Sequence, residues 1–194
     1  MTPAREKYAL VLADLALAAL LLLIGSFTWV HIVFVPGALP FDQLDRTGLA
    51  ILPSLVALSL ASLVVGATLT IAGRTFRRVL GLVQVLLSVG IVASIATVIA
   101  EPIATSSTEI AAMSGVSGDA QRALIASADL SVAVWLAIIA AALQVVVGAI
   151  IVVRSGRWPR SGARYEQAAP ATKADDAVSE WDDLSRGDDP TAEQ

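Results

Sequence analysis

Four long stretches of the chain carry almost no charge, and this feature restricts the fold more than any other. They cover about residues 8–27, 48–72, 79–100 and 131–153. Each has the roughly 17–25 residues that a helix needs to cross about 30 Å of hydrocarbon. Inside lipid the backbone must satisfy its own hydrogen bonds, which favours helices for such stretches. The sequence therefore predicts an all-α membrane protein with four transmembrane helices in a bundle.

The composition of the chain supports this prediction. Apolar residues make up 56% of it, and its mean hydropathy is +0.76, whereas soluble domains have roughly 45–50% apolar residues. Arg5 and Lys7 precede the first apolar stretch as in a signal peptide, but Asp14 interrupts that stretch and three more follow. We therefore expect a retained first helix.

Basic residues lie mainly at one set of helix ends. The two long loops contain only Arg46 and Arg122, whereas nine basic residues flank the two termini and the turn at residues 73–78. The nine are Arg5, Lys7, Arg74, Arg77, Arg78, Arg154, Arg157, Arg160 and Arg164. The positive-inside rule then predicts a multi-pass membrane protein with both the N and C termini in the cytoplasm.

A sharp change in composition divides the chain into a transmembrane domain, residues 1–160, and a cytoplasmic tail, residues 161–194. From Glu166 onward the tail has nine acidic residues against Lys173 and Arg186, a net charge of −7, while the rest of the chain has +3. A segment with so few apolar residues cannot bury enough surface to offset its ordering entropy. We therefore expect most of this acidic tail to be disordered.

One segment of the tail, residues 178–186, has the spacing of a short amphipathic helix. Val178, Trp181 and Leu184 recur at every third position, and Gly187 follows as a helix-ending residue. A helix this short is marginal alone and forms mainly against a partner. These three side chains either dock on a cytoplasmic protein or belong to a solvated tail, or the tail folds back on the arginines of residues 154–164.

Each apolar stretch also holds one polar side chain at a similar depth, roughly 9–15 Å from the basic helix ends at about 1.5 Å per residue. The four are Asp14, Thr68, Gln84 and Gln144. Polar groups within membrane spans are costly and mark functional sites, so a cluster around Asp14 is expected to carry a proton, hold a cation or bind an amine. Alternatively, the four join helices by hydrogen bonds worth about 0.6–2 kcal/mol each, or Asp14 reaches the interface or pairs with Arg77.

Three tryptophans, Trp29, Trp135 and Trp158, lie close to predicted helix ends, which is typical of interface anchors. In the first long loop, the β-branched run at residues 29–35 predicts a short extended segment. In the second, a short helix is expected over residues 119–127. Together these loops form a candidate outer cap.

No pattern typical of an enzyme site occurs in the sequence. It contains no H-E-x-x-H motif, no glycine-rich phosphate loop and no Ser/His/Asp arrangement, and it has no cysteine. The single histidine, His31, stands in a predicted loop without a second candidate ligand. We therefore expect a non-enzymatic protein without catalytic residues, metal or cofactor, in contact with the lipid bilayer and not with nucleic acid. Small residues on several helix faces also predict a homo-oligomer.

Several motifs resemble those of one known family. The most distinctive is Trp-Asp-Asp-Leu-Ser-Arg-Gly-Asp-Asp-Pro-Thr at residues 181–191; Thr-Gly-Leu-Ala-Ile-Leu-Pro at 47–53, Arg-Arg-Val-Leu-Gly at 77–81 and Trp29 also fit. They resemble the tryptophan-operon-region, or Trp biosynthesis-associated, membrane proteins of high-GC Gram-positive bacteria. The resemblance implies a four-helix protein of the inner (plasma) membrane that is encoded among tryptophan biosynthesis genes. It brings no catalytic or binding residues with it.

Three functions are compatible with these features. The first is an accessory protein of tryptophan biosynthesis that recruits a soluble partner through its cytoplasmic tail. The second is a small transporter or exporter of an aromatic amino acid or a precursor, which would use the polar group around Asp14. The third is a structural envelope protein that acts through its outer loops.

Overall fold

The computed structural model describes residues 3–158, and four long helices dominate this part of the chain. They are α1 (Pro3–Gly25), α3 (Pro53–Ile71), α4 (Arg74–Ala100) and α7 (Val132–Arg154). Each is long and apolar enough to cross a membrane. The chain is therefore a mostly helical, multi-pass membrane protein, which confirms the predicted fold class.

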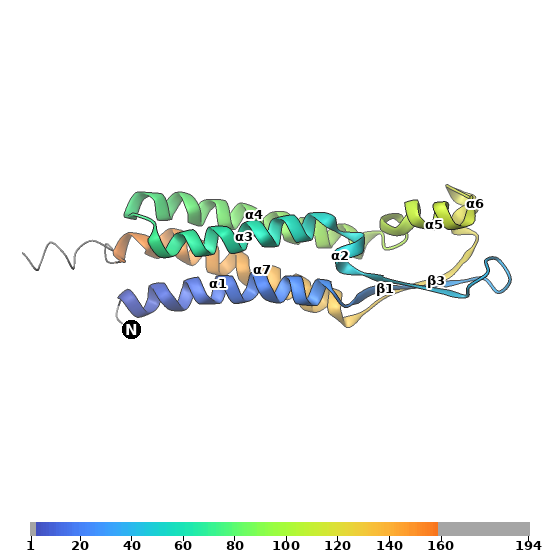
Figure 1. Cartoon of the computed structure of the whole chain (residues 1–194), viewed down its shortest axis with the longest axis horizontal. Helices are drawn as coiled ribbons and strands as arrows, with labels where there is room; N and C mark the ends of the chain where they lie inside the picture. Colours follow the sequence, from blue (N-terminus) through green and yellow to red (C-terminus); the bar gives the residue numbers. More distant parts are fainter. Residues whose placement is uncertain (1–2, 159–194) are drawn as a thin grey trace, which may run out of the picture. The chain divides into compact units, whose positions relative to one another are not determined.

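The four helices lie side by side, and each packs against two others (Figure 1). Helix α1 contacts α3 and α7, and α4 contacts the same two, so α1 and α4 are diagonal to each other. Successive helices run in opposite directions. We call the end of the bundle that holds Lys7, Arg77 and Arg154 the basic end, and the opposite end, from which the strands extend, the sheet end.

Helix boundaries differ from the predicted spans in three places. Helix α1 begins at Pro3, five residues before the predicted first span. The predicted second span begins as the single turn α2 (Gly48–Ile51), and α3 starts anew at Pro53, where a missing N–H is tolerated. Helix α4 begins at Arg74, five residues before the predicted third span. As a result, the basic residues expected in a turn lie on the first turns of a membrane helix.

Beyond the sheet end, two distant loops combine into a three-stranded antiparallel sheet (Figure 1). Strand β1 (Thr28–Phe34) lies between β2 (Gln43–Thr47) and β3 (Ile125–Leu130). Strand β1 is the extended segment expected at residues 29–35. In its centre, His31 pairs with Asp45 of β2 and Asp129 of β3.

The helix expected over residues 119–127 is mostly wrong. Only α6 (Asp119–Arg122) is helical, and β3 begins three residues later. Pairing with β1 decides the conformation of this segment, because it satisfies the backbone of β3 in a way that local sequence preference does not reveal. The remaining short elements are η1 (Ala104–Ser106), α5 (Ser107–Ser114) and η2 (Ser155–Arg157).

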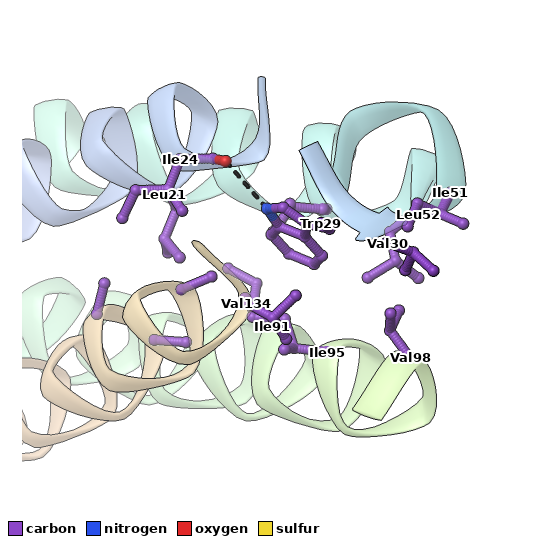
Figure 2. Packing of buried hydrophobic residues seen from close by; sticks show 14 of the residues in the cluster. Leu21, Ile24, Trp29, Val30, Ile51, Leu52, Ile91, Ile95, Val98 and Val134 are labelled. Carbon is purple, nitrogen blue, oxygen red and sulfur yellow. Dashed lines mark hydrogen bonds between the residues drawn. The ribbon is translucent and has the colours of Figure 1, made fainter. Parts of the chain in front are cut away.

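Trp29 is a core residue, so its predicted role as an interface anchor is wrong. Its side chain is fully buried, and its indole Nε1 donates a hydrogen bond to the carbonyl oxygen of Ile24 at 3.0 Å. Figure 2 shows the indole near Ile91 and Val134, between the end of α1 and the two helices opposite. Its ring also lies against Gly48 at the start of α2. Trp29 thus joins the first strand to the bundle.

We predict that Gly48→Ala destabilises the protein by about 1–3 kcal/mol, the usual cost of an overpacked core site. A Cβ at this position would lie 2.6 Å from Cδ2 of Trp29, so the ring must move. Gly90→Ala is the matched control, because its Cβ would meet nothing closer than Leu58 Cδ1 at 3.5 Å. Equilibrium unfolding in detergent, followed by tryptophan fluorescence, measures both. Equal stability of the two variants would contradict this packing.

A buried polar layer as the candidate functional site

The buried apolar side chains of the helices form two separate clusters. One occupies the sheet half of the bundle and includes Leu21, Leu55 and Ile91. The other occupies the basic half and includes Leu69 and Leu80. Between the two clusters every helix contributes fully buried polar side chains, which we call the polar layer: Asp14 from α1, Ser59 and Ser62 from α3, Gln84 and Ser88 from α4, and Gln144 from α7.

Asp14 lies at the centre of this layer. The side-chain amides of Gln84, on the diagonal helix α4, and Gln144, on α7, approach its carboxylate closely enough to act on it as hydrogen-bond donors. Among the described residues, however, no carboxylate or amide atom of the three has a hydrogen-bond partner at 3.5 Å or less. The carboxylate and the two amides thus lie near one another but form no hydrogen bond of 3.5 Å or less.

Helix α3 makes room for the carboxylate by means of a glycine. A Cβ at Gly66 would lie 2.8 Å from Oδ2 of Asp14 and 3.0 Å from Leu15, so α1 and α3 can approach this closely only at a residue without a side chain. Ser62 lies one turn away on the same face of α3, and its buried hydroxyl has no hydrogen-bond partner among the described residues. The layer therefore combines one carboxyl group with neutral amide and hydroxyl groups.

Thr68 does not belong to the polar layer, which corrects the predicted set. It is half-buried, and its hydroxyl donates to the carbonyl oxygen of Val64 on its own helix at 2.7 Å. Ser59 and Ser62 supply the polar side chains of α3 instead, because they share the buried face with Leu55 and Leu69. These buried residues of α3 recur every three or four positions, a helical pattern that the sequence contains. The prediction of Thr68 used only its distance from the helix end.

A second polar group lies at the basic end. Lys7 Nζ donates to the carbonyl oxygen of Thr70 at 2.6 Å, and the buried guanidinium of Arg77 lies 5.9 Å from the centre of the Trp158 ring.

Trp158 is 4% exposed, so it packs inside the protein and its predicted anchoring role is wrong. Trp135 is half-exposed near the start of α7, where an anchor fits, and its role stays a prediction.

The two polar groups are spaced regularly along the helices. Lys7 precedes Asp14 by seven residues on α1, and Arg77 precedes Gln84 by seven on α4. Seven residues are nearly two turns, so each basic residue shares a face with a member of the polar layer about 10 Å away. Between them lies the smaller hydrophobic cluster with Val11 and Leu80.

The sheet end contains a third group of polar side chains. Arg46 of β2 forms an ion pair with Glu109 of α5, and Gln121 of α6 donates to the carbonyl oxygen of Ser107 at 2.8 Å. A cavity of about 500 Å³ lies between α5 and α6, and Asp119 and Arg122 line part of it. The ion pair between Arg46 and Glu109 joins the two long loops, and an outer cap stays a prediction.

His31 and the tail residues are the remaining positions that the sequence analysis singled out. Nδ1 of His31 lies 2.7 Å from Oδ1 of Asp45, so His31 has a carboxylate neighbour that the sequence did not reveal. Within residues 3–158 no three His, Cys, Asp or Glu side chains are grouped so that they could hold a metal ion. Val178, Trp181 and Leu184 lie outside the described residues.

A family model supplies the identification. The model of the tryptophan-associated transmembrane protein family matches residues 11–191. The chain belongs to this family. This confirms the resemblance derived from the motifs. The match includes the polar layer of this tryptophan-associated transmembrane protein and the tail motif at residues 181–191. No curated protein and no solved structure matches the chain.

We predict an energetic coupling of about 0.6–2 kcal/mol between Asp14 and Gln144, the range of polar contacts between membrane helices. A double-mutant cycle with Asp14→Asn and Gln144→Leu measures it by equilibrium unfolding in bicelles. The matched cycle pairs Asp14→Asn with Thr68→Val, and we expect its coupling to stay within about 0.3–0.5 kcal/mol because Thr68 lies outside the layer. If the two cycles agree, Asp14 and Gln144 do not interact.

Proposed function

We propose that this protein is a non-enzymatic accessory protein that holds a soluble protein of tryptophan biosynthesis at the inner membrane through its acidic tail. The observation that carries the proposal is that the C-terminal end of α7 lies at the basic end of the bundle. Helix α7 ends at Arg154, η2 follows, and Trp158 is buried against Arg77 at the basic end. Trp158, which precedes the tail in the sequence, therefore lies at the end of the bundle that bears the arginines.

The basic end is the cytoplasmic end in this proposal. Basic residues concentrate there because translocation of positively charged segments is disfavoured, and the sheet end has only Arg46 and Arg122. A tail that starts at the cytoplasmic end reaches the compartment of soluble biosynthetic enzymes. The sheet and α5 then lie on the opposite side of the membrane.

The packing of the bundle supports an anchor better than an exporter of aromatic amino acids. A Cβ at Gly81 would lie 3.2 Å from the backbone nitrogen of Val152, and one at Gly148 would lie 3.3 Å from that of Val85, so α4 and α7 are in backbone contact at two levels. Transporters usually contain broken helices and internal repeats, and the sequence gives no clear sign of either. Close packing of α4 against α7 suits a fixed membrane anchor.

The tail peptide supplies the chemistry of recruitment. Val178, Trp181 and Leu184 have the spacing of one apolar helix face, and tryptophan is the side chain most often responsible for binding energy at protein interfaces. The surrounding tail has a net charge of −7, which favours a partner with a basic surface around an apolar groove. Non-enzymatic action is proposed because the sequence contains no catalytic pattern.

We predict that a membrane-impermeant maleimide labels Ser117→Cys in intact cells, because Ser117 is exposed beyond the sheet end. Gly73→Cys should react only after permeabilisation, because it lies in the turn between α3 and α4 at the basic end, with open space around its Cβ. The natural chain has no cysteine, so each variant reports one position. Labelling of Gly73→Cys alone in intact cells would show the opposite orientation.

The recruitment proposal predicts that membranes containing the full-length protein retain a soluble enzyme of tryptophan biosynthesis. The double variant Trp181→Ala, Leu184→Ala should bind it about tenfold or more weakly, since truncation of a central tryptophan costs about 2 kcal/mol or more. Ser185→Ala is the control, because it leaves the apolar spacing intact. Co-sedimentation with purified enzymes measures the affinities. Equal retention by the native protein and the double variant would refute the proposal.

A further inference from the structure

The polar layer has the features of an ion-binding site. Its carboxylate, its two amides and the hydroxyls of Ser59 and Ser62 are fully buried, and none has a hydrogen-bond partner at 3.5 Å or less among the described residues. Asp14 is the single acidic residue of the layer, and no basic residue belongs to it. We propose that this layer binds one small monovalent cation, Na⁺ or H⁺, at the carboxylate of Asp14.

The charge of the layer fixes the charge of its ligand. An isolated carboxylate inside a membrane bundle is strongly unfavourable, because the surrounding medium cannot replace its hydration. One positive charge on Asp14 makes the layer neutral, whereas a divalent ion would leave an excess charge in the same medium. Na⁺ and H⁺ each carry one positive charge and would neutralise the layer equally. They differ in the number of oxygen atoms that they bind.

The neighbouring groups also suit such a ligand. Carboxylate, amide and hydroxyl oxygens are the ligands that hard cations prefer. The amides of Gln84 and Gln144 can turn their oxygen atoms towards Na⁺, or accept a hydrogen bond from a protonated Asp14. Close packing at Gly66, where a Cβ would lie 2.8 Å from Oδ2 of Asp14, favours a small ligand over an organic amine.

Other charged groups face the layer only from the basic end. Lys7 on α1 and Arg77 on α4 lie about 10 Å away by helical spacing. Helix α3 has no charged residue, and α7 has only Arg154 at its end, paired with Glu6 at 3.1 Å. Coulomb energy falls with distance, so a cation about 3 Å from Asp14 is attracted more strongly than two positive charges about 10 Å away repel it.

The cation site does not depend on the tail, so it can be tested separately from recruitment. The full-length protein in lipid nanodiscs is unfolded by heat while NaCl replaces choline chloride at constant ionic strength and pH. If Na⁺ is the ligand, the midpoint rises with Na⁺ and saturates, and a concentration of about 100 Kd raises the ratio of folded to unfolded protein about 100-fold. The shift should vanish in Asp14→Asn.

If H⁺ is the ligand, Na⁺ has no effect, and stability instead falls as pH rises, because the folded state holds a proton that the unfolded state releases. This slope should also vanish in Asp14→Asn. Glu6→Gln is the matched control, because it removes a carboxylate from the same helix at the surface ion pair with Arg154. Thr68→Val controls for a polar group outside the layer.

The proposal is overturned if the native protein responds to neither Na⁺ nor pH, or if Asp14→Asn and the native protein respond equally. If Asp14→Asn does not fold, the double variant Gln84→Leu, Gln144→Leu provides the test with the carboxylate retained. It should bind the cation at least about tenfold more weakly than the native protein. An unchanged affinity in that variant would also overturn the site.

Discussion

A single carboxylate at the centre of a membrane bundle is the constraint on which this structure depends. Asp14 needs polar neighbours because hydrocarbon cannot solvate it, and α4 and α7 supply them with the side-chain amides of Gln84 and Gln144. This requirement fixes the rotation of each helix, because turning any one of them by half a turn would place a polar side chain in lipid. Gly66 then allows α1 and α3 to close around the carboxylate.

The polar layer separates two unlike ends of the bundle. Towards the sheet end, the larger hydrophobic cluster continues through Trp29 into the strands, so bundle and sheet share one core. Towards the basic end, the smaller cluster separates the layer from Lys7, Arg77 and Trp158. The proposed cation site lies in the layer between these two ends.

The sequence was sufficient for features that depend on length, charge and composition. It predicted the four spans, the extended segment in the first loop and three members of the polar layer, because apolar length and isolated polar residues are local signals. Prediction from the sequence failed for features that depend on the rotation of a helix about its axis or on pairing between segments distant in the chain. Thr68 has the right depth but the wrong face, Trp29 and Trp158 are drawn inward by neighbours remote in sequence, and β3 forms because β1 lies beside it.

The most direct test of this account is whether α1 and α7 meet at the polar layer in the lipid bilayer. Cross-linking answers it, because the natural chain has no cysteine to interfere. In native membranes, a short bifunctional thiol reagent should join Asp14→Cys to Gln144→Cys efficiently within one chain. It should not join Thr68→Cys to Gln144→Cys. The reverse result, with Thr68 cross-linked and Asp14 not, would contradict the central layer.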